Sequence, residues 1–167
     1  MLKVGKIAPG FSLFEMPEHK ISLSDYEGKR VILVFYPADW SPVCGDEVTL
    51  YNEMLSFFEK HDAKVIGISV DSKWCHQAFS HDRNLHFPLL SDFEPKGEVA
   101  KMYNVYDESE GTAQRALFVI DEFGIIRWNY LSPVDTNPGA DGILTALEEI
   151  DNSRCILPQT SNSITIK

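Results

Sequence analysis

The sequence lacks long apolar runs and carries little positive charge. No stretch approaches the ~18 apolar residues of a membrane-spanning helix. Near the N-terminus, Lys6, Pro9 and Gly10 interrupt the apolar residues too early for a secretory signal peptide. The chain has 15 lysines and arginines against 25 aspartates and glutamates. Such an acidic chain is a poor partner for nucleic acid or an anionic membrane, so we expect it to bind neither. From the lack of a signal peptide and of a membrane span we expect a cytoplasmic protein.

Cysteine and histidine are also scarce and scattered. Three cysteines, an odd number without a CxxC pair, fit a reducing compartment better than a disulfide scaffold. The five histidines show no zinc-ligand spacing. We therefore expect no metal site.

Alternating strand and helix patterns predict one α/β domain over residues 1–150, with a mixed central sheet flanked by helices. A polar tail over 151–167 follows, which we expect to be mobile or used in an interface. Pro88 suggests that the short strand around it lies at an edge or a bulge. The expected elements are an extended segment over 7–24, strands over 30–36, 63–70 and 87–90, helices over 42–60, from 71 or 72, and over 95–103, a loop over 111–114, strands over 115–121 and 125–131, and a helix over 140–150.

Cys44 is the first candidate for chemistry, because it lies at the start of an expected helix just beyond a strand. Ser41 and Pro42 form a suitable N-cap and first-turn pair. An ordinary thiol with a pKa of about 8.5 is only about 3% ionised at pH 7. The free N–H groups and dipole of a helix N-terminus stabilise a thiolate. On this helix alone, a reactive cysteine and a buried structural cysteine both stay open.

Two carboxylates, Asp46 and Glu47, follow Cys44 closely. If both faced the sulfur, they would disfavour a thiolate. They are tolerable if they point away or hold a cation in place. We expect Glu47 to orient an arginine guanidinium.

The octapeptide from Pro37 to Cys44, PADWSPVC, resembles the peroxiredoxin motif P-x-x-x-T/S-x-x-C, and Glu47 follows it as in that family. Further segments are similar to the AhpC/TSA-type peroxiredoxins in the same order, so that the likeness covers about residues 3–150. These segments are VGKIAPGFSL at 4–13, GISVDS at 67–72, FPLLSD at 87–92 and RALFVID at 115–121.

The resemblance implies a thioredoxin-like fold and a cofactor-free peroxidase for hydrogen peroxide, organic hydroperoxides or peroxynitrite. It implies that Cys44 is the peroxidatic cysteine and passes through a sulfenic acid. Ser41 would bind the peroxide, Pro37 would shield the pocket, and Arg115 would stabilise the thiolate and the developing charge. We expect the alternative arginine, Arg127, to be a solvated hairpin residue. The resemblance also implies a thioredoxin-like or other small thiol reductant and a homodimer or larger homo-oligomer.

Two other cysteines are candidates for resolving the sulfenic acid. Cys75 is expected on the apolar side of its helix, with Trp74, Ala78 and Phe79, where a structural role is the default. Cys155 falls in the expected tail, where two-cysteine members of the family carry a resolving cysteine, but the usual Val-Cys-Pro surroundings are absent. A one-cysteine enzyme reduced by an outside thiol stays open.

Two other classes of function also stay open. One is a redox sensor or interaction protein in which Cys44 oxidation changes oligomer or partner contacts. The other is a thioredoxin-like domain whose cysteine is purely structural.

Overall fold

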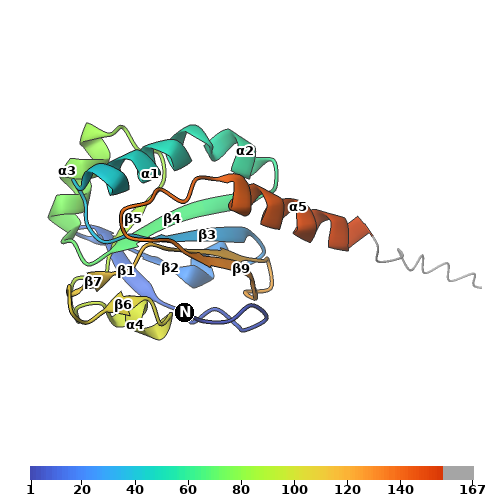
Figure 1. Ribbon diagram of the computed structural model, residues 1–167, viewed down its shortest axis with the longest axis horizontal. Helices are drawn as coiled ribbons and strands as arrows, with labels where there is room; N and C mark the ends of the chain where they lie inside the picture. Colours follow the sequence, from blue (N-terminus) through green and yellow to red (C-terminus); the bar gives the residue numbers. More distant parts are fainter. Residues whose placement is uncertain (156–167) are drawn as a thin grey trace, which may run out of the picture.

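A computed structural model describes residues 1–155, with the side chains of residues 1–154, as a β-sheet covered on both faces (Figure 1). The rest of the expected tail, residues 156–167, lies outside the described residues. The strands are β1 Ser12–Met16, β2 His19–Ser22, β3 Arg30–Phe35, β4 Ala63–Ser69, β5 Leu89–Ser91, β6 Tyr106–Asp107, β7 Thr112–Ala113, β8 Ala116–Ile120 and β9 Ile126–Leu131. The helices are the 3-10 helix η1 Leu23–Tyr26, α1 Pro42–Glu53, α2 Leu55–Glu59, α3 Lys73–Asp82, α4 Glu98–Met102 and α5 Asp141–Cys155. None of the helices in this described part of the chain has the length and apolar character needed to cross a membrane.

The main sheet has seven strands in the order β2-β1-β5-β4-β3-β8-β9, while β6 and β7 pair separately. Its central strands β3, β4 and β5 run parallel. The strands on either side run antiparallel to their neighbours, β8 to β3, β9 to β8, and β1 to both β5 and β2. The predicted α/β class with a mixed central sheet is confirmed.

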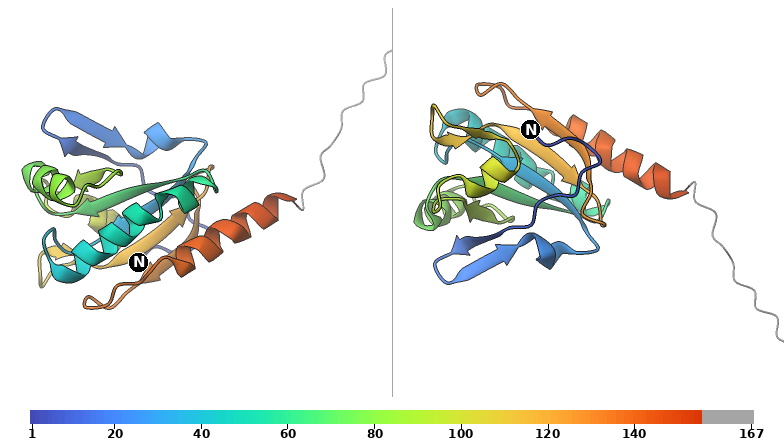
Figure 2. Two further views of the ribbon diagram at one scale, coloured as in Figure 1. Left: turned by 90° about the horizontal axis from the view of Figure 1, so that it is seen from above. Right: turned by 90° about the horizontal axis from the view of Figure 1, so that it is seen from below.

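The central strand β3 divides the core into two layers, because successive side chains of a strand point to opposite faces. One set packs with α1, α2, α3 and α5: Ile32, Val34 and, just beyond the strand, Tyr36. The other set packs with α4 and the N-terminal segment: Val31, Leu33 and Phe35. Figure 2 shows the two layers from above and below. Burying each such side chain stabilises the fold by ~1.5–3 kcal/mol, so the end of β3 is a rigid base for the loop that follows.

The helix predicted over 42–60 is divided into α1 and α2. At the division, the N–H of Met54 lies 3.1 Å from the carbonyl oxygen of Leu50 and 3.2 Å from that of Tyr51. An N–H group shared between two carbonyl oxygens is typical of a tightened helical turn, and α2 begins as a separate helix after it. The other predicted helix on this side of the fold, over 140–150, begins close to its predicted start.

The prediction of an edge position around Pro88 is wrong, because β5 lies between β1 and β4. Pro88 precedes the strand, and its carbonyl oxygen accepts a hydrogen bond from the N–H of Gly67 at 3.0 Å. The missing N–H of proline therefore removes no ladder bond from β5. Two smaller predictions also need correction: the helix predicted over 95–103 is the shorter α4, and the loop predicted over 111–114 contains β7.

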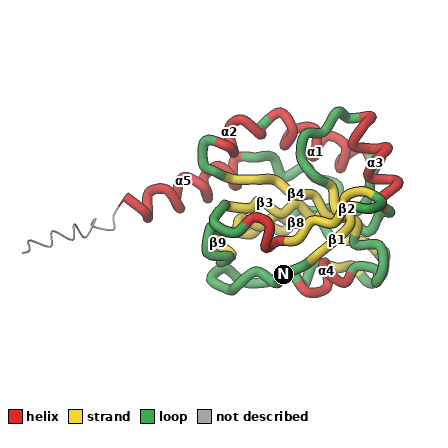
Figure 3. The backbone as a smooth tube through the Cα atoms, turned by 180° about the vertical axis from the view of Figure 1, so that it is seen from behind, coloured by secondary structure: helices red, strands yellow, loops and turns green. Residues whose placement is uncertain are grey.

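The last helix continues to Cys155 instead of ending at residue 150 (Figure 3). Its final turns are tied to the sheet. The Asp151 carboxylate lies 2.6 Å from Arg30 Nη1 and 2.6 Å from His61 Nδ1, and Arg154 pairs with Glu122. These partners come from distant parts of the chain, so the sequence around residue 150 alone gave no sign of them.

Candidate active site

Cys44 lies in the first turn of α1, directly beyond the C-terminal end of β3. Ser41 is the N-cap of the helix: its hydroxyl oxygen accepts a hydrogen bond from the N–H of Cys44 at 3.3 Å, and Pro42 takes the first helical position. The side chain of Cys44 is completely buried within the core layer below α1. A small molecule therefore reaches the sulfur only when the surrounding side chains move apart.

Arg115 brings a positive charge to this sulfur. It precedes β8, which runs antiparallel beside β3 with Ala116 opposite Phe35, so that Arg115 emerges beside the start of the α1 loop. Its Nη2 donates a hydrogen bond to Cys44 Sγ at 3.3 Å. Its Nε and Nη2 also donate to the carbonyl oxygen of Val134, at 3.2 and 2.9 Å. Because Arg115 is only 2% exposed, little water screens its charge from the sulfur.

Glu47 fixes the other side of the same guanidinium. It lies on α1 one turn beyond Cys44, is fully buried, and pairs with Arg115 Nη1. The hydroxyl of Tyr51 donates to its second oxygen at 3.3 Å. Burial raises the pKa of the Glu47 carboxyl to about 7, and its contacts with Arg115 and Tyr51 oppose this rise. Asp46, in contrast, is exposed, so only one of the two carboxylates enters the site, as expected.

Pro37 lies half-buried at the edge of this group. It shares with Arg115, Gln114 and Val134 the lining of a cavity of about 150 Å³. The structure thus brings together the residues that the motif singled out, while their catalytic roles stay a prediction.

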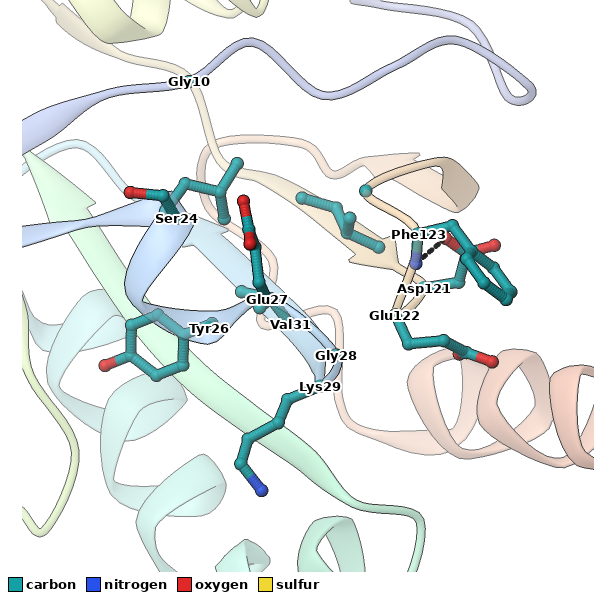
Figure 4. A pocket seen from close by; sticks show the side chains of 13 residues that line it. Gly10, Ser24, Tyr26, Glu27, Gly28, Lys29, Val31, Asp121, Glu122 and Phe123 are labelled. Carbon is teal, nitrogen blue, oxygen red and sulfur yellow. Dashed lines mark hydrogen bonds between the residues drawn. The ribbon is translucent and has the colours of Figure 1, made fainter.

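A larger hollow of about 440 Å³ lies at the opposite end of β3, lined among others by Lys29, Val31 and Phe123 (Figure 4). No cysteine is among its lining residues. Cys44 follows the other end of the strand, so this hollow is separate from the group around Cys44.

Cys75 occupies a different environment from the one predicted. The buried residues of α3 are His76 and Phe79, while Cys75 is only partly buried and Trp74 is 62% exposed. Ser72 is the N-cap of α3, and its hydroxyl oxygen accepts a hydrogen bond from the N–H of Cys75. The helix begins at this point, and His76 comes to lie on its inward face. Burial, followed by the nearby charges of Asp39 and Asp71, raises the pKa of the Cys75 thiol to about 11. This environment disfavours the Cys75 thiolate.

For Cys155, the structure places the backbone at the end of α5, and its side chain lies outside the described residues. Arg127 is 47% exposed and pairs with Asp121, as expected for a solvated hairpin residue.

Sequence reasoning missed the hydrogen-bonding partners behind the motif. These are Tyr51, one turn beyond Glu47, and the carbonyl oxygen of Val134. The spacing of four residues on one helix offered a signal for Tyr51. A backbone carbonyl in a loop leaves no such signal.

The site and the fold agree with those of known proteins. A family model described as the AhpC/TSA family matches residues 4–129. Alkyl hydroperoxide reductase E of Mycobacterium tuberculosis is 39% identical over 129 residues, covering 77% of this chain and 84% of that protein. A chloroplastic 2-cysteine peroxiredoxin of Chattonella marina var. antiqua is 37% identical over 164 residues, covering 92% and 83%.

Solved structures agree with the fold. The reduced 2-Cys peroxiredoxin of Plasmodium vivax superposes with a TM-score of 0.83 at 28% identity, covering 98% of this chain and 91% of that chain. The peroxidoxin BcpB of Mycobacterium tuberculosis gives 0.82 at 28% identity, covering 90% and 99%. The predicted thioredoxin-like fold is confirmed. Because the family match includes both Cys44 and Arg115, this chain belongs to the AhpC/TSA family, the peroxiredoxins, and is a thiol-dependent peroxidase.

Proposed function

We propose that the Cys44 thiolate attacks one oxygen of hydrogen peroxide or of an organic hydroperoxide. An S–O bond forms as the O–O bond breaks, and the departing oxygen takes up a proton and leaves as water or an alcohol. The sulfur loses two electrons and becomes a sulfenic acid. The observation that carries this proposal is the hydrogen bond from Arg115 Nη2 to Cys44 Sγ at 3.3 Å, in a site without exposed sulfur.

The roles of the surrounding residues follow from their positions. Arg115 stabilises the thiolate and the negative charge that develops on the departing oxygen, and Glu47 holds its guanidinium in place. Ser41 already accepts a bond from Cys44 N, and its hydroxyl hydrogen is left to donate to the peroxide. Pro37, at the rim of the cavity beside Arg115, limits the access of water.

We also propose that the sulfenic acid is not resolved by Cys75. Resolution needs a thiolate, and the carboxylates of Asp39 and Asp71, which lie within 4.8 Å of the Cys75 sulfur, disfavour that charge. The chloroplastic relative named a 2-cysteine peroxiredoxin supports the other candidate, Cys155.

Within one chain, however, Cys155 is far from Cys44. Asp151, one turn before Cys155, contacts Arg30 at the first residue of β3, whereas Cys44 follows the last. At ~3.3 Å per residue the strand separates the two ends by roughly 17 Å, and a disulfide needs Cα atoms within about 7 Å. We therefore propose that Cys155 of a second copy of the chain, or an outside thiol, resolves Cys44.

The remaining partners are proposed from family membership. The substrate is a peroxide, the reductant is a thioredoxin-like or other small thiol, and the active form is a homodimer or larger homo-oligomer. The cytoplasmic location expected from the sequence also stays a proposal.

The function is tested by mixing the reduced protein with one equivalent of hydrogen peroxide. Tryptophan fluorescence follows the reaction, and intact mass with and without a sulfenic-acid trap identifies the product. We expect a fast signal that Cys44→Ser abolishes. Retained peroxide turnover in that variant would contradict the proposal, and so would an unreactive wild-type protein.

A further inference from the structure

A buried histidine lies behind the active-site loop and takes no part in the chemistry proposed above. His76 of α3 is 1% exposed, and the side chain of its partner Asp39 is completely buried. The two lie 37 residues apart in the sequence, and their Nδ1 and Oδ2 atoms are 2.8 Å apart. Asp39 belongs to the loop between β3 and α1 that carries both Pro37 and Ser41.

The hydrogen bonds around this pair are complete. His76 Nε2 lies 3.1 Å from the carbonyl oxygen of Leu90 on β5, and its Nδ1 faces the Asp39 carboxylate, so each ring nitrogen has an acceptor beside it. Asp39 Oδ1 accepts a hydrogen bond from the Tyr36 hydroxyl at 2.8 Å. His76 is thereby fixed to the sheet at one nitrogen and to the loop at the other.

The loop is also anchored through its backbone. The N–H of Asp39 donates to Asp71 Oδ2 at 2.8 Å, and that carboxylate accepts in turn from the Ser69 hydroxyl at 2.6 Å. Asp39 is thus held by its side chain, through Tyr36 and His76, and by its main chain, through Asp71 just after β4.

The next residue shows why such anchoring is needed. Trp40 has a φ of 63°, in the left-handed region that a bulky side chain rarely adopts. It stands between the anchored Asp39 and Ser41, the N-cap of α1. A strained conformation of this kind persists only where the surroundings determine it.

We propose that His76 and Asp39 are positioning residues for the peroxide reaction. Their buried pair holds the loop in the conformation that places Ser41 and Pro37 around Cys44. The proposal rests on the peroxidase function proposed above, and it adds a requirement from α3, which contributes no atom to the reacting group. Since a misplacement of about 1 Å costs on the order of 100-fold in rate, loosening the loop should slow the peroxide reaction strongly.

The test compares two reactions of the same sulfur in His76→Leu. Both hydrogen peroxide and iodoacetamide must reach the buried sulfur of Cys44 through the same opening, so the ratio of their rate constants cancels the effect of access. Only the oxidation also needs Ser41 and Pro37 in position. We expect the ratio of the two rate constants to fall about 100-fold relative to wild type. His76→Gln, which keeps an N–H donor, should recover at least about tenfold of this loss. The matched control is His81→Gln, an exposed histidine on the same helix, which should keep the wild-type ratio.

If His76→Leu does not fold, Asp39→Asn gives the same test with almost no change in volume. Thermal unfolding is recorded for each variant, and rates are compared well below the transition. A folded variant with the wild-type ratio would overturn the proposal, because a merely structural pair lowers stability and leaves the ratio alone. Slow oxidation of the wild-type protein itself would instead count against the peroxidase function.

Discussion

Replacing Arg115 by methionine removes the charge beside Cys44 while keeping an extended side chain of similar length. Two losses follow from the contacts of Arg115. The sulfur loses its donor at 3.3 Å, and Glu47 stays behind as a buried carboxylate without its ion-pair partner. The first loss acts on the reaction and the second on stability, so the two are measured separately.

The magnitudes follow from the type of each contact. A hydrogen bond to a charged group contributes about 1.5–3 kcal/mol. If it is present in the transition state, its loss slows oxidation roughly 10- to 160-fold, at 1.36 kcal/mol per factor of ten. Removing one partner of a buried ion pair costs up to about 3–5 kcal/mol while the remaining group is charged. Because burial already raises the pKa of Glu47 to about 7, protonation of its carboxyl reduces this cost at neutral pH.

The assay is stopped-flow tryptophan fluorescence with hydrogen peroxide in excess, beside urea unfolding of each variant. We compare Arg115→Met with the double variant Arg115→Met/Glu47→Gln, in which the orphaned charge is also removed. The double variant should regain much of the lost stability and none of the lost rate. Arg127→Met is the control, because Arg127 is a half-exposed arginine of the neighbouring hairpin.

A folded Arg115→Met protein that oxidises at the wild-type rate would refute the reasoning, since the guanidinium would then have no part in the transition state. Recovery of the rate in the double variant would refute it as well. In that case the slow single variant would reflect the unpaired carboxylate alone.

The other predictions concern the residues around this pair. Burial raises the pKa of the Glu47 carboxyl from 4.5 to about 7. A carboxyl with a raised pKa in the folded state contributes stability that is fully present below pH 4.5 and is lost as the pH rises through 7. The unfolding free energy of wild type should therefore fall relative to that of Glu47→Gln between about pH 5 and 8. Cys75→Ser should leave peroxide turnover within about twofold of wild type, because its thiol does not resolve the sulfenic acid; a large loss would restore Cys75 as a candidate. Cys155→Ser should abolish any disulfide-linked dimer on a non-reducing gel after peroxide treatment, and a dimer that persists would assign resolution elsewhere. Ser41→Ala should lose about 0.5–2 kcal/mol of stability with its N-cap and also slow oxidation, whereas Ser41→Thr should keep both, as urea unfolding and stopped-flow rates would show.

Local patterns in the sequence predicted the elements that carry the site. The apolar run 30–36 predicted β3, and Ser41-Pro42 predicted the start of α1, because a buried strand and a capped helix both leave marks on adjacent residues. The contact between Cys44 and Arg115 joins residues 71 apart, and only the resemblance to a family suggested it. Spacing within the chain contains no such information.

What the sequence did not predict depends on partners that are distant in the chain. His76 was not singled out, because an inward-facing histidine on a short helix is understood only with Asp39 and Leu90 in view. The extension of α5 past residue 150 likewise depends on Arg30 and Glu122 of other elements. Polar residues in these places follow no period that a pattern search detects.

The complete burial of Cys44 also has a consequence for the product of the reaction. The sulfur lies in the same packed layer as Ile32 and Val48, with no exposed surface. Protein interiors are packed about as densely as organic crystals, and forcing extra atoms into such a core costs about 1–3 kcal/mol. A sulfenic acid adds one polar oxygen at this point. Oxidation therefore loosens the packing that positioned the thiol, and faster hydrogen exchange in the first turns of α1 should mark each molecule that has reacted.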